Sequence, residues 1–187
     1  PEYTYLVEQE GEQIECYDAY AFPCQITLEE EQKFINGICY DIYEKLGAHP
    51  MTVNGVDGVY FAVWAPNAAR VSVVGDFNHW DGRVYQMQRL QYRESMSCLS
   101  HRFRLGSLYK YELKLKDGLT YLKADPYANA AELRPNTASI VADLSGFEWT
   151  DGGWMEKRKK TDYKKEPLLI YEVHLGSWRK PEKEEWD

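Results

Sequence analysis

Residues 71–82 read Val-Ser-Val-Val-Gly-Asp-Phe-Asn-His-Trp-Asp-Gly, an apolar strand followed by a polar turn that carries a tryptophan. Turns run over protein surfaces, because their backbone polar groups resist burial. Trp80 is therefore poorly placed for a core. We expect its ring to contact a flat ligand.

Segments that alternate between apolar and polar residues recur across residues 59–146, with turn residues between them. Asp117-Gly118 is a strong hairpin signal. The strands expected from this pattern are residues 59–65, 70–75, 109–115, 119–124 and 138–141. The sequence therefore predicts a mainly β chain with an immunoglobulin-like β-sandwich.

The rest of the chain divides into segments with other patterns. Residues 1–26 are polar and tyrosine-rich, as expected for the end of an additional N-terminal domain. Residues 27–49 form a helical connector, which a capping box of Thr27 and Glu30 opens and Gly47 ends. Residues 50–146 hold the sandwich, and residues 147–187 hold a basic, solvated linker and a further strand.

That further strand is expected at residues 168–175, which are almost continuously apolar. Such runs are typical of strands buried on both faces of a parallel sheet. A parallel strand needs neighbours, and none follows in the sequence before Asp187. We therefore expect this strand to come from a sheet that the chain does not complete.

Charge and aromatic content favour a neutral ligand. The net charge of -8 argues against binding to a phosphate backbone, which requires clustered Lys and Arg. The chain has 15 Tyr and 6 Trp, whose rings combine an apolar face with a hydrogen-bonding edge. A sugar ring fits that combination, although many of these rings are expected in the core.

No metal site or cofactor is expected. The four cysteines, Cys16, Cys24, Cys39 and Cys98, have neither metal-ligand nor disulfide-framework spacing, and the histidines are scattered. No apolar run is long enough to span a membrane, and the first residues do not resemble a signal peptide. Because the cysteines are expected to be reduced thiols, we expect a cytoplasmic protein, and a monomer. Because the sequence opens on Pro1, we expect it to be part of a longer protein.

Seven motifs follow one another in order and cover most of residues 44–178. They are Leu46-Gly47-Ala48-His49-Pro50, residues 61–68 (Phe-Ala-Val-Trp-Ala-Pro-Asn-Ala), residues 74–82, Tyr109-Lys110-Tyr111-Glu112, residues 124–128 (Ala-Asp-Pro-Tyr-Ala), residues 134–139 (Arg-Pro-Asn-Thr-Ala-Ser) and residues 170–178 (Ile-Tyr-Glu-Val-His-Leu-Gly-Ser-Trp). In combination they resemble the motifs of bacterial 1,4-α-glucan (glycogen) branching enzymes.

The resemblance implies a family 48 carbohydrate-binding module at residues 50–146, followed by the first strand of an α-amylase-type (β/α)8 barrel. Such an enzyme cuts an α-1,4-glucan and transfers the segment to a 6-hydroxyl, using two carboxylates on later barrel strands. No catalytic residue is therefore expected here, and the fragment alone should be inactive. Its expected partners are an α-glucan such as glycogen and its own catalytic barrel.

Within the module, the resemblance implies four carbohydrate-binding residues: Trp80, Lys110, Asn78 and Tyr121. Trp80 and Lys110 match the stacking tryptophan and the lysine of the glycogen-binding module of the AMP-activated kinase β subunit. Asn78 lies in the same turn as Trp80. A second tryptophan that follows the hairpin in that module is missing here, and Tyr121 is the expected substitute. Alternatively, Trp80 packs against the catalytic barrel.

Two other functions stay open. The chain could be a stand-alone glycogen-binding or regulatory module, although residues 170–178 argue against one because such a module does not need a barrel strand. It could also begin a debranching enzyme or trehalohydrolase of the same superfamily. Leu46-Gly47-Ala48-His49-Pro50 and the segment at 124–128 favour a branching enzyme over these.

Residues 96–104 depart from the resemblance, because they read as a poor strand (Met-Ser-Cys-Leu-Ser-His-Arg-Phe-Arg). One permitted codon choice, read in a shifted frame, encodes Glu-Leu-Phe-Ile-Pro, which fits the family. We hypothesise a local frameshift. It would leave a damaged strand without an inward aromatic, and with Arg102 and Arg104 where apolar groups are expected.

Overall fold

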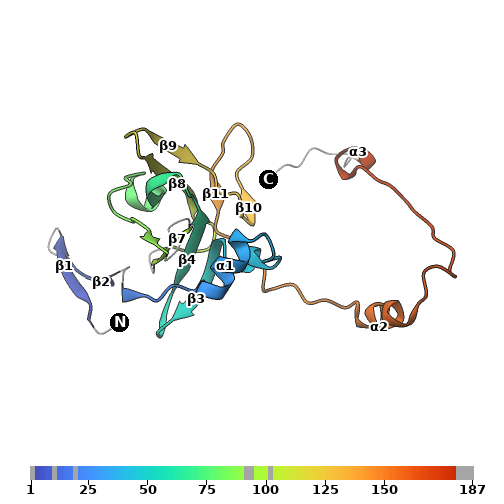
Figure 1. Ribbon diagram of the computed structural model, residues 1–187. Coiled ribbons are helices and arrows are strands. Elements are labelled where there is room, and N and C mark those ends of the chain that lie inside the picture. Colours follow the sequence, from blue (N-terminus) through green and yellow to red (C-terminus); the bar gives the residue numbers. More distant parts are fainter. Residues whose placement is uncertain (1–2, 10–11, 19–20, 91–94, 101–102, 180–187) are drawn as a thin grey trace. The chain divides into compact units, whose positions relative to one another are not determined.

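The computed structural model describes residues 3–9, 12–18, 21–90, 95–100 and 103–179 (Figure 1). The chain divides into two compact units at the step from Gly146 to Phe147. The first unit contains the strands, and the second contains short helices and irregular chain. Each unit is described by itself below.

The first unit begins with a hairpin and a short helical segment. Strands β1 (Tyr5–Gln9) and β2 (Glu12–Cys16) pair antiparallel. Helix α1 (Leu28–Ile35) and the 3₁₀ turn η2 (Ile42–Glu44) follow. The capping box is confirmed, since Thr27 Oγ1 accepts from the Glu30 backbone at 3.2 Å and Glu30 Oε2 accepts from the Thr27 backbone at 2.8 Å. The backbone bond lowers the pKa of Glu30.

Two antiparallel sheets form the predicted β-sandwich. One has the order β3-β4-β7-β6, and the other has the order β10-β11-β8-β5 with β9 paired to β8. Their bounds are β3 Gly47–Val53, β4 Val56–Trp64, β5 Ala68–Val74, β6 Gln88–Arg89, β7 Ser95–Ser100, β8 Leu108–Leu115, β9 Thr120–Lys123, β10 Ala130–Ala131 and β11 Ser139–Ile140. The main core is formed by apolar residues of β4, β5 and β8, including Phe61, Val73 and Tyr111.

Strand β3 was not predicted, because Gly47 and Pro50 read as the end of a helix. Gly47 instead starts a strand with a φ of +112°, and a Cβ there would lie 2.8 Å from the Tyr127 carbonyl oxygen. Only glycine fits so close an approach. Pro50 is tolerated because β3 is an edge strand, where one backbone donor can be lost.

The prediction of a poor strand at residues 96–104 is wrong for its first half. Strand β7 pairs with β4 along its whole length and with β6 at its start. Phe103 is 4% exposed, and its ring centroid lies 4.5 Å from that of Phe61 and 4.0 Å from that of Phe77. An inward aromatic is therefore present in the 96–104 segment, after the end of β7. In β7 itself, pairing with neighbours outweighs the weak local propensity.

Of the two arginines expected to disturb this strand, only Arg104 can be placed, and it does not have the predicted effect. Arg104 is exposed, so it carries no buried charge. Arg102 lies outside the described residues. The frameshift itself stays a hypothesis about the coding DNA.

A buried carboxylate ties the turn after β9 to the core. Asp125 is 6% exposed, and its Oδ2 accepts hydrogen bonds from the hydroxyls of Tyr109 at 2.7 Å and Tyr111 at 3.0 Å. Its Oδ1 accepts from the Tyr127 backbone at 2.8 Å, and its own backbone donates to Ser139 Oγ at 2.9 Å. Burial raises the pKa of Asp125, although these hydrogen bonds oppose the shift.

The second unit lacks the strand expected at residues 168–175. Helices α2 (Gly152–Lys160) and α3 (Leu175–Trp178) are its regular elements, and residues 168–174 form none among the described residues. A strand exists only through hydrogen bonds to a neighbour, and these residues pair with none in the described chain. The basic residues of α2 are exposed, as predicted for a solvated linker, although the structure gives them helical backbone.

No helix in the described part of the chain combines the length and apolar character that crossing a membrane requires. The described cysteine side chains, Cys24, Cys39 and Cys98, are free thiols.

If Phe103 completes the core, Phe103→Ala should lower the free energy of unfolding by about 3–5 kcal/mol, since it removes a buried aromatic ring. Urea unfolding followed by tryptophan fluorescence would measure the change. Leu105→Ala is the matched control, because Leu105 is 59% exposed and its loss should change stability by less than about 0.5 kcal/mol. Equal effects of the two substitutions would contradict the placement of Phe103.

Candidate functional site

The pairing of β5 with β8 separates a core face from an outer face. Val73 pairs with Tyr111, and Val74 pairs with Lys110. Neighbouring residues of a strand point to opposite faces, and directly paired residues share a face. Tyr111 is buried in the core, so Lys110 and the next-but-one residue, Glu112, lie on the outer face.

The turn after β5 holds two consecutive residues in the left-handed region. The 3₁₀ turn η3 (Asp76–Asn78) is followed by His79 with a φ of +53° and Trp80 with a φ of +59°. Each such residue other than glycine costs about 1–2 kcal/mol. Backbone strain of this kind concentrates at functional sites, where the surrounding structure enforces it.

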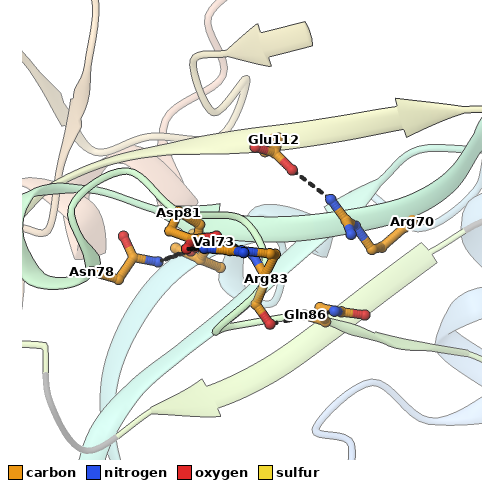
Figure 2. Close-up of polar contacts among 7 residues, drawn as sticks. All are labelled: Arg70, Val73, Asn78, Asp81, Arg83, Gln86 and Glu112. Atoms are coloured by element: carbon orange, nitrogen blue, oxygen red, sulfur yellow. Dashed lines mark hydrogen bonds and ion pairs between the residues drawn. The ribbon is translucent and has the colours of Figure 1, made fainter. Parts of the chain in front are cut away.

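Asn78 enforces this conformation from inside the turn. Its Oδ1 accepts from the Gly75 backbone at 3.0 Å. Its Nδ2 donates to the carbonyls of Val73 at 3.1 Å and Asp81 at 3.0 Å (Figure 2). The residue is 7% exposed. Both amide hydrogens are thus committed to the backbone, so Asn78 positions the turn.

The far side of the turn is closed by an ion pair. Arg83 Nη2 lies 2.6 Å from Asp81 Oδ2, and hydrogen bonds from Arg83 lower the pKa of Asp81 to about 2. The Arg83 carbonyl in turn accepts a 3.4 Å bond from Gln86, as Figure 2 shows. Because Arg83 is well exposed, this pair contributes little to stability and mainly orders the chain.

The turn packs against the outer face of β8 at Gly82. A Cβ on Gly82 would overlap the carboxylate of Glu112. That carboxylate is held by Arg70 of β5, whose Nη2 lies 2.6 Å from Glu112 Oε1 (Figure 2). Glycine at position 82 therefore allows the turn to lie close to the strand that carries Lys110.

Trp80 and Lys110 are brought together beside this contact. The indole Nε1 of Trp80 donates to Asp76 Oδ1 at 2.8 Å, which fixes the orientation of a half-buried ring. Lys110 Nζ lies 6.0 Å from the ring centroid and donates to Thr137 Oγ1 at 2.8 Å. Thr137, which the sequence does not predict as a site residue, therefore lies in the same surface patch as Trp80 and Lys110. The sequence feature that could have identified Thr137 is its place in the Arg-Pro-Asn-Thr-Ala-Ser motif.

Tyr121 does not join Trp80 and Lys110. It pairs with Leu113, and its neighbour Leu122 pairs with Glu112. Tyr121 therefore lies on the core side of the sheet edge, where Lys123 Nζ lies 5.7 Å from its ring centroid. Leu122, which is 49% exposed, lies on the same face as Lys110. Counting two-residue steps from the Asp117-Gly118 turn could have identified this face.

The patch of Trp80, Lys110 and Thr137 suits a neutral ligand that has both an apolar face and hydroxyl groups. An indole offers a flat apolar surface, and an ammonium and a hydroxyl offer hydrogen bonds next to it. Among the described residues, no three acidic, His or Cys side chains group in a way that could hold a metal ion.

Comparisons with known proteins find similarity to one family model and to several enzymes. Residues 45–128 match the family of carbohydrate-binding module 48 (isoamylase N-terminal domain). The chain is 50% identical over 177 residues to the 1,4-alpha-glucan branching enzyme GlgB of Thermosynechococcus vestitus, a match that covers 94% of this chain and 23% of that protein. It is 49% identical over 176 residues to GlgB of Synechococcus sp. (strain JA-3-3Ab), covering 91% of this chain and 23% of that protein.

Among solved structures, ligand-free PulA from Klebsiella pneumoniae matches with a TM-score of 0.43 and 25% identity, over 53% of this chain and 10% of that one. The chain spans about a quarter of the length of the branching enzymes that it matches. The expected resemblance to the N-terminal portion of bacterial branching enzymes is confirmed.

Asn78→Ala should lower the free energy of unfolding by about 2–4 kcal/mol, because it leaves one backbone donor and two carbonyls in the turn without their partner. It should also free the indole of Trp80, which would lower the tryptophan fluorescence anisotropy. Urea unfolding and time-resolved anisotropy measure the two effects. His79→Ala is the control, since His79 is exposed, and should change stability by less than about 1 kcal/mol. An Asn78→Ala protein as stable as the control would refute the positioning role.

Proposed function

We propose that this chain, which is related to the N-terminal quarter of 1,4-alpha-glucan branching enzymes, binds an α-glucan through Trp80 and Lys110. The observation that carries the proposal is the strained turn. The backbone holds His79 and Trp80 at positive φ, and Asp76 fixes a partly exposed indole beside a lysine. Strain maintained to present an aromatic ring is easier to explain by ligand contact than by packing.

The chemistry of a glucose ring fits this arrangement. One face of a pyranose carries C–H groups, which stack on the indole of Trp80. Its hydroxyls can accept hydrogen bonds from the Lys110 ammonium, which has three donors and uses one for Thr137. Thr137 and Leu122 extend the same face, so they are the nearest candidates for contact with a second ring.

Asn78 and Tyr121 receive different roles in this proposal. Asn78 holds the turn and does not touch the glucan, because its amide is used by the backbone. Tyr121 lies on the other face from Lys110, so the patch has one stacking ring. Affinity for a short oligosaccharide should then be weak, with Kd in the millimolar range (about -4 kcal/mol). On a polymer, repeated sites raise the effective concentration of the ligand and compensate for this.

The proposal for the parent protein is glycogen branching in the cytoplasm. Transfer of an α-1,4-glucan segment to a 6-hydroxyl requires two carboxylates that flank the scissile bond. We assign neither to this chain, and place them in a catalytic barrel that the 187 residues do not include. The module would hold the polymer while the barrel does the chemistry, and residues 168–175 would pair with the barrel's other strands.

Trp80→Ala should weaken retention on glycogen by at least about tenfold, because it removes the one stacking surface of the patch. Lys110→Ala should weaken it by a smaller factor. Affinity electrophoresis in glycogen-containing gels measures both effects. The matched control is Trp149→Ala, which removes a 76% exposed tryptophan from the second unit.

If Trp80→Ala protein is folded, as shown by an unchanged urea midpoint, and is retained as well as the wild type, glucan binding by this turn is excluded. The role of Trp80 is then packing against another domain.

The 187-residue chain should not branch amylose, since the proposed carboxylates are absent. An iodine-stain assay would show no loss of absorbance with this chain alone. A full-length GlgB from Thermosynechococcus vestitus is the positive control. Measurable turnover by the 187 residues would overturn the division of labour between module and barrel.

A further inference from the structure

A pocket of about 270 Å³ lies in the first unit and shares no residue with the Trp80 patch. It is lined by the end of the helical segment, the start of β3, Asn129 at the end of the turn before β10, and the chain after β11. The lining residues that matter for its chemistry are Tyr43, Glu44, His49, Asn129, Asp143 and Leu144.

Buried contacts hold two walls of this pocket in place. Gly47 allows the 125–129 turn to approach β3, because its missing side chain makes room for the Tyr127 carbonyl. Asp125 ties the same turn to the tyrosines of β8. Asn129 and His49 are therefore carried by segments that the core fixes, as expected of a pocket that exists before its ligand binds.

The hydrogen bonding of His49 fixes which of its ring nitrogens donates. Its Nε2 lies 2.9 Å from the Leu46 carbonyl oxygen, which can only accept, so Nε2 carries the proton. In a neutral imidazole the other nitrogen, Nδ1, is then an acceptor. The side-chain amide of Asn129 can add two hydrogen-bond donors and one acceptor. Asp143 accepts from the Ser145 backbone at 2.8 Å through Oδ1, and its carboxylate adds further acceptor capacity.

The composition of the lining selects the class of ligand. It contains no Lys or Arg, so a phosphorylated ligand would lack a partner and meet two carboxylates. It also includes apolar surface from Tyr43, which is 58% exposed, and Leu144, which is 66% exposed. Apolar walls with a few acceptors and amide donors fit a neutral molecule with many hydroxyls.

We infer that this pocket is a second α-glucan subsite, in which Tyr43 stacks on a glucose ring and Asn129, His49 and Asp143 bind its hydroxyls. The identity of the sugar rests on the proposed function. The volume is just below the range of roughly 300–1,000 Å³ for drug-sized ligands, so it takes about one or two rings. Two subsites in one unit would let a single branched polymer bind it twice, with a gain in avidity.

The test is a titration of the ¹⁵N-labelled 187-residue chain with maltoheptaose, followed by two-dimensional NMR. We expect saturable shifts at the amides of Asn129 and of residues 142–145, in addition to shifts around Trp80. Tyr43→Ala should raise the Kd of the pocket shifts by at least about fivefold and leave the Trp80 shifts unchanged. Tyr40→Ala is the matched control, because Tyr40 is 85% exposed and does not line the pocket.

The outcomes separate this inference from the proposed function. Shifts around Trp80 without shifts in the pocket, or pocket shifts that Tyr43→Ala leaves intact, would overturn the second subsite alone. Pocket shifts that persist in Trp80→Ala protein would support it, even if the Trp80 amides of the wild type do not respond. A parallel titration with calcium chloride tests whether the carboxylates of Glu44 and Asp143 bind a cation instead. Pocket shifts with calcium but not with sugar would also overturn the inference.

Discussion

The register between β5 and β8 is the constraint on which both the core and the site depend. Pairing Val73 with Tyr111 sends Tyr109 and Tyr111 inward and turns Lys110 outward. A slip of one residue would exchange these faces, which would bury a lysine and expose two tyrosines. The hydroxyls of those tyrosines also bind Asp125, so the same register anchors the turn that leads to Asn129. One pairing thus determines where both candidate subsites lie.

The turn that carries Trp80 shows how the fold maintains an unfavourable local conformation. Consecutive residues at positive φ would relax in a free loop, because nothing there compensates for the strain. Here Asn78 satisfies backbone groups on both sides of the strained residues, and Gly82 lets the turn pack against Glu112. Asp76 then limits the rotation of the indole. A ring held in this way loses little conformational entropy when a ligand stacks on it.

The sequence predicts local features of this fold well and features that depend on partners poorly. The capping box of α1 and the hairpin at Asp117-Gly118 follow from a few adjacent residues, so both could be read directly. Strand β7 could not be read, because its weak pattern is overcome by pairing with β4. Strand β3 was hidden by Gly47 and Pro50, whose role depends on the distant Tyr127 carbonyl. The prediction for residues 168–174 was wrong in the opposite sense. Their pattern is typical of a strand, but they pair with no neighbour in the described part of the chain.

The same division holds for the candidate site. The resemblance of the motifs identified Trp80 and Lys110, and the structure brings these residues together. The resemblance could not show that Thr137 binds Lys110, because these two residues belong to segments that meet through β11. The resemblance also misplaced Tyr121, whose face follows from the register of β8 with β9 that the Asp117-Gly118 turn sets.

Pro50 has a consequence for how the molecule avoids its own copies. Strand β3 ends its sheet, and the free edge of such a strand is a template on which a second chain can add a strand. A proline there offers no N–H to an incoming strand and interrupts the row of donors. The residue that made β3 hard to recognise is thus of the kind that proteins place on edge strands to limit edge-to-edge aggregation.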